Sequence, residues 1–123
     1  MTLPVEVAGY LADLGLGWVN GIYPVAIPQE LQADTAHTII LVTEVENTPS
    51  EFNNNTFSAL FQTVQVQIFY AMDFSISTDD VEVFLMKKFA SDGWTIAVSE
   101  PRDIDPDTKQ MFKTLQFSRN KRV

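Results

Sequence analysis

Few residues in this sequence have side chains suited to catalysis. His37 is the only histidine and there is no cysteine, so a thiolate nucleophile and a disulfide are both excluded. No hydroxyl near His37 has the setting of a nucleophile, and no feature of the sequence supports a Ser-His-Asp triad. We expect no catalytic residue, and the protein is not expected to be an enzyme.

Three alternating carboxylates near the C-terminus resemble part of a calcium-binding loop. They are Asp103, Asp105 and Asp107, but an EF-hand needs glycine at its sixth position and glutamate at its twelfth. Those positions hold Thr108 and Thr114. Aspartate followed by proline at 105–106 is typical of a β-turn, with a weak adventitious cation site as the alternative. We expect the turn and no metal site.

Glu44 and Glu46 lie on one face of a predicted strand. A carboxylate pair needs a pocket and two different pKa values before it does acid–base chemistry, so a solvated face is the better explanation. The sequence has no glycine-rich phosphate loop, no zinc-ligand spacing and no aromatic pattern typical of nucleic-acid binding. We therefore expect no cofactor.

The charges are unevenly divided along the chain. The formal net charge is −8, every lysine and arginine lies between Lys87 and Arg122, and the first 86 residues hold 11 of the 16 acids. A purely acidic surface repels a nucleic-acid backbone, so sequence-specific nucleic-acid binding is not expected. One interpretation is a solvated acidic face. The other is head-to-tail self-association, in which the acidic surface of one copy contacts a basic surface of the next; any remaining acidic face is suited to line a channel for DNA.

The length of 123 residues suffices for one domain with a layered core. No apolar run reaches the ~20 residues that span a bilayer. The first ten residues carry Glu6 and no basic residue, unlike a secretory signal. We expect a single domain over residues 1–123 with no membrane partner, and the lack of cysteine fits a reducing compartment.

The chain is organised around residues 61–72, FQTVQVQIFYAM, in which apolar and polar residues alternate as in a half-buried strand. Further strands are predicted at 37–46, 94–99 and 111–118, the last of them near an edge because Lys113 interrupts its apolar row. Amphipathic helices are predicted after Thr2 and between Ser77 and Gly93. Asn20-Gly21 predicts a hairpin.

These elements predict an α+β fold. We expect an antiparallel sheet of about four main strands, two helices packed on one side, and a small N-terminal hairpin. Residues 118–123 are expected to form a basic C-terminal tail, and a flexible conformation of this tail is one option.

Several residues are candidates for contacts with another subunit. Residues 47–59, NTPSEFNNNTFSA, have the composition of a long loop, and its two phenylalanines either pack on their own domain or reach a partner. Apolar residues of the second helix cover more than half its circumference, so the first helix or another subunit is expected to bury the excess. The proposed subunit or tail interface comprises Phe52, Phe57, Val83, Met86, Lys87, Lys113 and Arg119.

Four segments, taken in order, are similar to a family of small tail-completion or tail-terminator proteins. The family comes from siphophages and prophages of lactobacilli and related Gram-positive hosts. The segments are HTIILVTEVENTP, FQTVQVQIFYAM, GWTI, and DIDPDTKQMF with its strand, and they span roughly residues 24–119. The resemblance depends on their order, their spacing and the total length, and no single motif carries it.

The resemblance implies a small α+β subunit that forms a homo-oligomeric ring, expected to be a hexamer. Such a ring caps the finished tail tube and joins it to the head connector. The implied partners are further copies of the chain, the tail tube protein and head–tail connector proteins, and DNA passes through the ring. The implied location is the virion tail or neck, and the host cytoplasm during assembly. The alternatives are another neck or minor tail subunit, or a small non-catalytic accessory module with a ligand pocket between sheet and helices.

Overall fold

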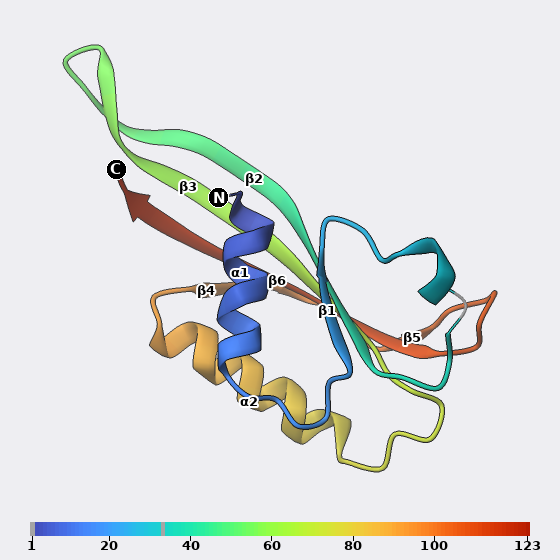
Figure 1. Cartoon of the computed structure of the whole chain (residues 1–123). Helices are drawn as coiled ribbons and strands as arrows, with labels where there is room; N and C mark the ends of the chain where they lie inside the picture. Colours follow the sequence, from blue (N-terminus) through green and yellow to red (C-terminus); the bar gives the residue numbers. More distant parts are fainter. Residues whose placement is uncertain (1, 33) are drawn as a thin grey trace.

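Six strands and two α-helices account for most of the residues that this computed structural model describes, 2–32 and 34–123 (Figure 1). The helices are α1 (Leu3–Asp13) and α2 (Thr78–Ser91), and a short 3₁₀ helix is η1 (Gln29–Leu31). The strands are β1 (Gly21–Pro24), β2 (Ile39–Asn53), β3 (Thr56–Phe69), β4 (Thr95–Ser99), β5 (Asp103–Ile104) and β6 (Met111–Arg122). The order along the sheet is β1-β2-β3-β6-β4, with β5 beside β6. β1 and β2 run parallel and the other pairs are antiparallel, so the fold is α+β with a mixed sheet.

β3 is the central strand and has the alternation that the sequence predicts. Val64, Val66 and Ile68 are fully buried on one face, while Gln65 and Gln67 are half-buried on the other. β3 is hydrogen-bonded to β2 on one side and to β6 on the other. Because side chains alternate between the two faces of a strand, β3 defines a core face and an open face for the whole sheet.

Both helices cover the core face. α1 contributes Leu3, Val7 and Leu11, and α2 contributes Leu85 and Phe89, to one buried cluster. The sheet residues of that cluster include Ile40, Val42, Val64, Val66, Ile68, Leu115 and Phe117. The expectation of two helices on one side of the sheet is therefore confirmed, whereas the expectation of four antiparallel strands fits only roughly.

α2 begins and ends at the signals that the sequence carries. The side chain of Ser77 accepts a hydrogen bond from the backbone N of Asp80 at 3.4 Å, as an N-cap residue does. Gly93 follows the helix with a φ of +96°, a left-handed conformation that glycine adopts without a Cβ clash. These two residues set the length of the helix.

The predicted N-terminal hairpin is wrong, because the chain does not turn at Asn20-Gly21. It continues into β1, which pairs in parallel with the start of β2. Asn20 Oδ1 accepts a hydrogen bond from the backbone N of Thr38 at 2.9 Å, and Asn20 N donates to the Thr38 carbonyl at 2.8 Å. Trp18 packs edge-on against Phe74, with ring centroids 6.1 Å apart. A hairpin with flanks this short is marginal alone, and pairing with a distant strand replaces it.

The strand that contains Lys113, β6, lies next to the last strand of the sheet, so the prediction that it lies near an edge is confirmed, although not for the predicted reason. β6 is hydrogen-bonded to β3 on one side and to β4 on the other. Lys113 is only 8% exposed and lies opposite Ile68, on the core face. Its ammonium group donates to the backbone carbonyl of Glu100. A buried polar group with a hydrogen-bond partner is tolerated, so the interrupted apolar row does not require an edge.

The predicted flexible tail at 118–123 is largely strand. Ser118 to Arg122 pair with β3 from Thr63 to Ala59, and the backbone N of Val123 donates to the Ser58 carbonyl at 3.0 Å. The backbone makes these hydrogen bonds whatever the side chains are. The basic composition therefore did not prevent strand formation.

The predicted loop at 47–59 is the outer part of a long β-hairpin. β2 and β3 remain paired as far as Asn53 and Thr56, and Asn54 and Asn55 form the turn. The φ angles of these two asparagines are +51° and +65°, as both central residues of a type I′ turn require, and asparagine tolerates this region. We call residues 44–64 and 118–122 together the arm, which extends past the helices (Figure 1).

Replacing Asn55 with glycine (Asn55→Gly) is expected to raise the free energy of unfolding by about 0.5 kcal/mol, because Asn-Gly is the preferred type I′ pair and glycine adopts positive φ without steric cost. Urea denaturation followed by circular dichroism measures the change. The matched control is Asn53→Gly, at the last residue of β2, which pairs with Thr56 and where glycine is expected to lower stability by roughly 0.5–1 kcal/mol. If the Asn55→Gly protein were less stable than the Asn53→Gly protein, the type I′ assignment of this turn would be wrong.

Candidate assembly site

Two phenylalanines form the outermost aromatic contact of the arm. Phe52 and Phe57 lie opposite each other in β2 and β3, and their rings meet edge-on with centroids 6.5 Å apart. Phe52 is 74% exposed and Phe57 is 38% exposed. Pairing between β3 and β6 ends at Ala59, so the tip is two-stranded. The two rings therefore contact each other and present apolar surface to the outside.

The two long edges of the arm carry opposite charges. No strand in the described part of the chain pairs with the outer edge of β2 beyond Val42, or with that of β6 beyond Ser118. The acids on this part of β2 are Glu44, Glu46 and Glu51, and the bases on this part of β6 are Arg119, Lys121 and Arg122. Neither segment contains a charge of the other sign. The separation of charge along the sequence thus becomes a separation across the arm.

A shallow groove of about 640 Å³ runs between α2 and the segment that follows β4. Val83, Met86 and Lys113 line it, so the fold brings together three of the predicted interface residues. Val83 and its neighbour Phe84 are each 44% exposed. The excess apolar surface of α2 is therefore only partly buried by its own chain.

α1 does not cover this surface of α2. It meets α2 near the C-terminal end, where the rings of Tyr10 and Phe89 lie 5.1 Å apart. The Tyr10 hydroxyl donates to the carboxylate of Asp92, just beyond the helix, and its oxygen lies 3.2 Å from the Lys88 carbonyl. Lys87 lies on the exposed side of the same helix. An apolar patch beside the groove is thus left exposed.

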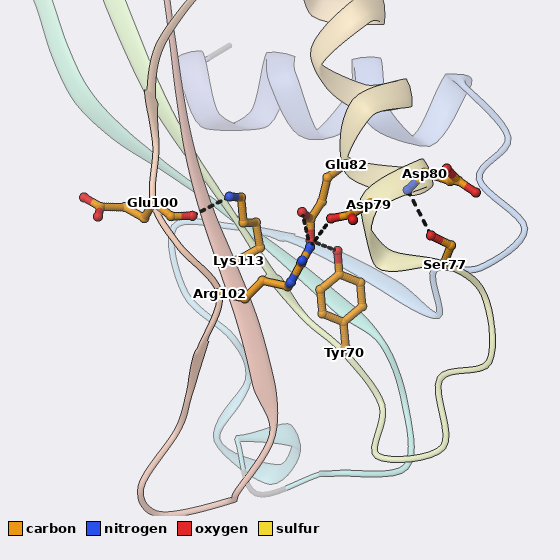
Figure 2. A network of polar contacts seen from close by, with 8 residues as sticks. All are labelled: Tyr70, Ser77, Asp79, Asp80, Glu82, Glu100, Arg102 and Lys113. Carbon is orange, nitrogen blue, oxygen red and sulfur yellow. Dashed lines mark hydrogen bonds and ion pairs between the residues drawn. The ribbon is translucent and has the colours of Figure 1, made fainter.

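A buried carboxylate in the wall of the groove connects α2 to the sheet. Glu82 is 3% exposed; it accepts a hydrogen bond from the Tyr70 hydroxyl at 2.6 Å and pairs with the Arg102 guanidinium at 2.8 Å. The same guanidinium contacts Asp79 at 2.8 Å. Figure 2 shows these side chains converging, Tyr70 from the end of β3, Glu82 and Asp79 from α2, and Arg102 from the segment after β4. The network holds that segment against the helix.

The same network sets the ionisation of its members. Burial, and then the hydrogen bond to the Glu82 carboxylate, raise the pKa of Tyr70 far above its usual value. The hydrogen bond to Asp79, and then the charge of Glu82, raise the pKa of Arg102. Both groups therefore keep their protons near neutral pH. The Tyr70 hydroxyl acts as a hydrogen-bond donor, and a tyrosine in this state is not poised as a base.

Arg119 is occupied within its own chain. Its guanidinium lies over the Trp94 ring, 4.3 Å from the centroid, and its Nε donates to Gln62 Oε1 at 2.9 Å. Its Nη2 pairs with Glu6 at 2.6 Å, and this hydrogen bond is the main cause that lowers the pKa of Glu6. Lys113 likewise has a partner in its own chain. Reversing either charge would disturb the fold, so neither residue gives a clean test of a subunit contact.

The structure divides the predicted interface residues among separate places. Phe52 and Phe57 lie at the tip of the arm; Val83, Met86 and Lys113 lie in the groove; Lys87 lies on the exposed side of α2; and Arg119 lies at the base of the arm, against α1. The sequence analysis missed Glu82 and Arg102. A signal for Glu82 was present, since it precedes Leu85 and Phe89 by three and seven residues and so falls on the buried stripe of α2. A charge on such a stripe needs a partner.

The residues considered first for chemistry lie apart from these surfaces. His37 is exposed and pairs with Asp34, Nδ1 to Oδ2, at 2.7 Å. The predicted turn after Asp105 is confirmed, because its side-chain oxygen accepts from the backbone N of Asp107 at 2.8 Å. Over residues 2–32 and 34–123, no three histidine, aspartate or glutamate side chains gather as a metal ion would require.

A family model described as a protein of unknown function, DUF806, matches residues 3–122. The chain belongs to the DUF806 family. The DUF806 match runs from the first residue of α1 to the last of β6, and so includes the arm, the groove and both helices. No curated protein is significantly similar to the chain. None of the helices in the described residues is both long enough and apolar enough to cross a membrane.

Proposed function

We propose that this protein is a structural virion subunit, a tail terminator or tail-completion protein that forms a hexameric ring. The ring caps the finished tail tube, joins it to the head connector, and lets DNA pass through. The subunits assemble in the host cytoplasm and become part of the tail or neck of the virion. The protein acts through its surfaces and not as an enzyme.

The arm is the observation that carries this proposal beyond the resemblance. It leaves the helix-covered part of the sheet and ends in a two-stranded tip with exposed aromatic rings. A two-stranded ribbon is marginally stable in water, and exposed apolar patches commonly mark interaction sites. A terminator has neighbouring subunits and a tube end to contact, and the arm supplies surface for such contacts.

The alternatives differ in how well they fit the packing. Another neck or minor tail subunit would use the same surfaces on a different partner. An accessory module with a ligand pocket between helices and sheet fits less well, because that space is filled by fully buried side chains such as Val66, Leu85 and Phe117. We therefore retain the neck or minor tail subunit as the main alternative.

Purified siphophage tail tubes that lack their terminator provide the test. Electron microscopy of tubes mixed with the protein is expected to show added density at a tube end, and native mass spectrometry is expected to show a hexamer. A protein that binds no tube end would contradict the terminator function. Binding to another neck component, with no binding to tubes, would favour the alternative.

The tip of the arm is expected to contribute to tube binding. Substituting both rings (Phe52→Ala with Phe57→Ala) should weaken tube-end binding by roughly tenfold or more, as the loss of exposed aromatic contacts at an interface commonly does. The free energy of unfolding should fall by only about 1 kcal/mol, the worth of one cross-strand aromatic pair. Quantitative labelling of tube ends and urea denaturation measure the two effects.

The matched control for the tip is Ile104→Ala. Ile104 is 60% exposed and lies in β5, at the opposite end of β6 from the arm. This variant is expected to bind tubes as the wild type does. If the double phenylalanine variant bound tube ends as tightly as the wild type, the tip would not be part of the interface.

A further inference from the structure

Both edges of the arm present backbone groups that no other strand uses. β1 stops pairing with β2 at Val42, and β4 stops pairing with β6 at Ser118, in the part of the chain that the structure describes. Free N–H and C=O groups along an edge are a template for another strand. The remaining edges are shorter templates, since β1 has 4 residues and β4 has 5.

The pairing register puts an acid of β2 and a base of β6 on each side of the arm. Glu44 lies opposite the buried Val64, on the core-face side, and Lys121 lies on that side as well, with its ammonium 3.4 Å from Glu6 of α1. Glu46 lies opposite Thr63, on the open-face side, together with Arg122. The prediction that Glu44 and Glu46 share one face is therefore wrong, because the pairing register of β2 shifts between these two residues. Opposite charges facing each other across paired strands are favourable, and like charges are unfavourable.

We infer that copies of this chain join edge to edge through their arms, the acidic outer edge of β2 in one copy lying beside the basic outer edge of β6 in the next. This inference rests on the proposed ring, for which it names the contact between neighbouring subunits. Charge complementarity favours unlike edges, because β2 beside β2 or β6 beside β6 places like charges together. The contact is therefore head-to-tail, which closes into a ring when the rotation between copies allows it.

The strand directions agree with this arrangement. β2 and β6 both run antiparallel to β3, so they run parallel to each other. When copies are related by rotation about an axis inclined to the arm, β6 of one copy and β2 of the next still run in nearly the same direction. Within one chain Glu46 is level with Ser118, and the stagger that such an inclination gives to neighbouring strands brings Glu46 toward Lys121 of the next copy. The new pair then extends the sheet from one subunit to its neighbour without a change of strand direction.

The charges at the two edges are accessible. In the described part of the chain, Glu44 and Glu46 take part in no ion pair. The Lys121 and Arg122 side chains are 46% and 80% exposed, and each lies 3.4 Å from an acid of its own chain. Exposed pairs of this kind contribute little to stability, so the two bases can change partners on assembly.

Charge-reversed variants test the contact. Glu44→Lys with Glu46→Lys makes both edges basic, and Lys121→Glu with Arg122→Glu makes both edges acidic. Each variant alone is expected to self-associate roughly tenfold or more weakly than the wild type at low salt, since attraction becomes repulsion. An equimolar mixture should recover near wild-type association, because alternating copies bring unlike edges together. Analytical ultracentrifugation measures all of these.

The matched control reverses two acids outside the arm. Asp13→Lys with Glu30→Lys changes the net charge by the same amount as the β2 variant, and it should associate as the wild type does. A mixture of the two arm variants that fails to recover would overturn the inference. A wild type that stays monomeric at low salt and at the highest soluble concentration would overturn it as well.

Tube binding by the same proteins separates this inference from the proposed function. If the wild type caps tube ends but the mixture does not recover, the edge contact is wrong and the terminator function stands. If the mixture recovers but the wild type binds no tube end, the edge contact stands and the terminator function is wrong.

Discussion

Alanine in place of Phe89 (Phe89→Ala) is expected to lower the free energy of unfolding by about 3–5 kcal/mol, the usual range for a buried phenylalanine. Phe89 has no exposed surface. It stacks on Phe117 of β6 with ring centroids 4.0 Å apart and planes 6° from parallel, and it meets Tyr10 and Trp94 edge-on. Removing the ring leaves a cavity between α1, α2 and β6. This cavity cannot close unless a helix moves. Urea denaturation, followed by both fluorescence and circular dichroism, measures the loss.

The same helix offers a matched control for Phe89. Phe84 is also a phenylalanine of α2, but it is 44% exposed and outside the buried cluster. Phe84→Ala is expected to change the free energy of unfolding by less than about 1 kcal/mol, as surface substitutions usually do. Comparable losses in the two variants would mean that α2 does not pack through the Phe89 side.

The second large effect is expected at the buried carboxylate of the groove. Glu82→Ala should lower the free energy of unfolding by about 2–4 kcal/mol, because it leaves the Tyr70 hydroxyl without its acceptor and Arg102 without its buried partner. Both groups contact Glu82 at 2.8 Å or less. Chemical denaturation of the two proteins at neutral pH gives the difference.

Two further variants separate the buried partner from the exposed one. Asp79 contacts the same guanidinium at 2.8 Å but its side chain is 76% exposed, so Asp79→Ala should cost less than about 1 kcal/mol. Glu82→Gln keeps an acceptor for the Tyr70 hydroxyl and should fall between the wild type and Glu82→Ala. If Asp79→Ala were as damaging as Glu82→Ala, burial would not be the source of the effect.

The elements that were predicted well are those encoded by short-range patterns. The alternation around Val66 identified the central strand and its buried face. Ser77 and Gly93 marked the two ends of α2, because a cap and a left-handed residue act within one turn of a helix. Aspartate and proline at 105–106 predicted the turn for the same reason, since the hydrogen bonds of such a turn span only a few residues.

The errors share a physical cause, which is that local composition was used to judge long-range pairing. Asparagines and a proline at 47–59 suggested a loop, but residues of β2 and β3 pair across a two-residue turn and extend the hairpin. Asn20-Gly21 suggested a turn, yet Asn20 binds the backbone of Thr38, which follows 18 residues later. Lys113 was the reason for placing its strand near an edge, yet its side chain is buried and donates to a carbonyl in the segment after β4, a partner that is not evident from the neighbouring residues.

The sequence predicted only part of the candidate interface. The two phenylalanines at 52 and 57 are exposed at the tip of a hairpin and not in a loop, and their place in an interface stays a prediction. The groove residues were suggested by an over-apolar helix, and the fold places Val83 and Met86 beside Lys113. Arg119 was chosen for its charge, but the structure pairs it with Glu6, which is 113 residues away.

The sequence by itself determined the α+β class, the central strand, the two helices and the division of acids from bases, since each depends on residue type and on spacing over a few positions. Only the tertiary structure decided which strands are neighbours. Strand pairing is made by backbone groups that every residue carries, and side-chain pattern alone does not say which partner they meet. That pairing placed the acidic strand and the basic strand on opposite edges of one arm.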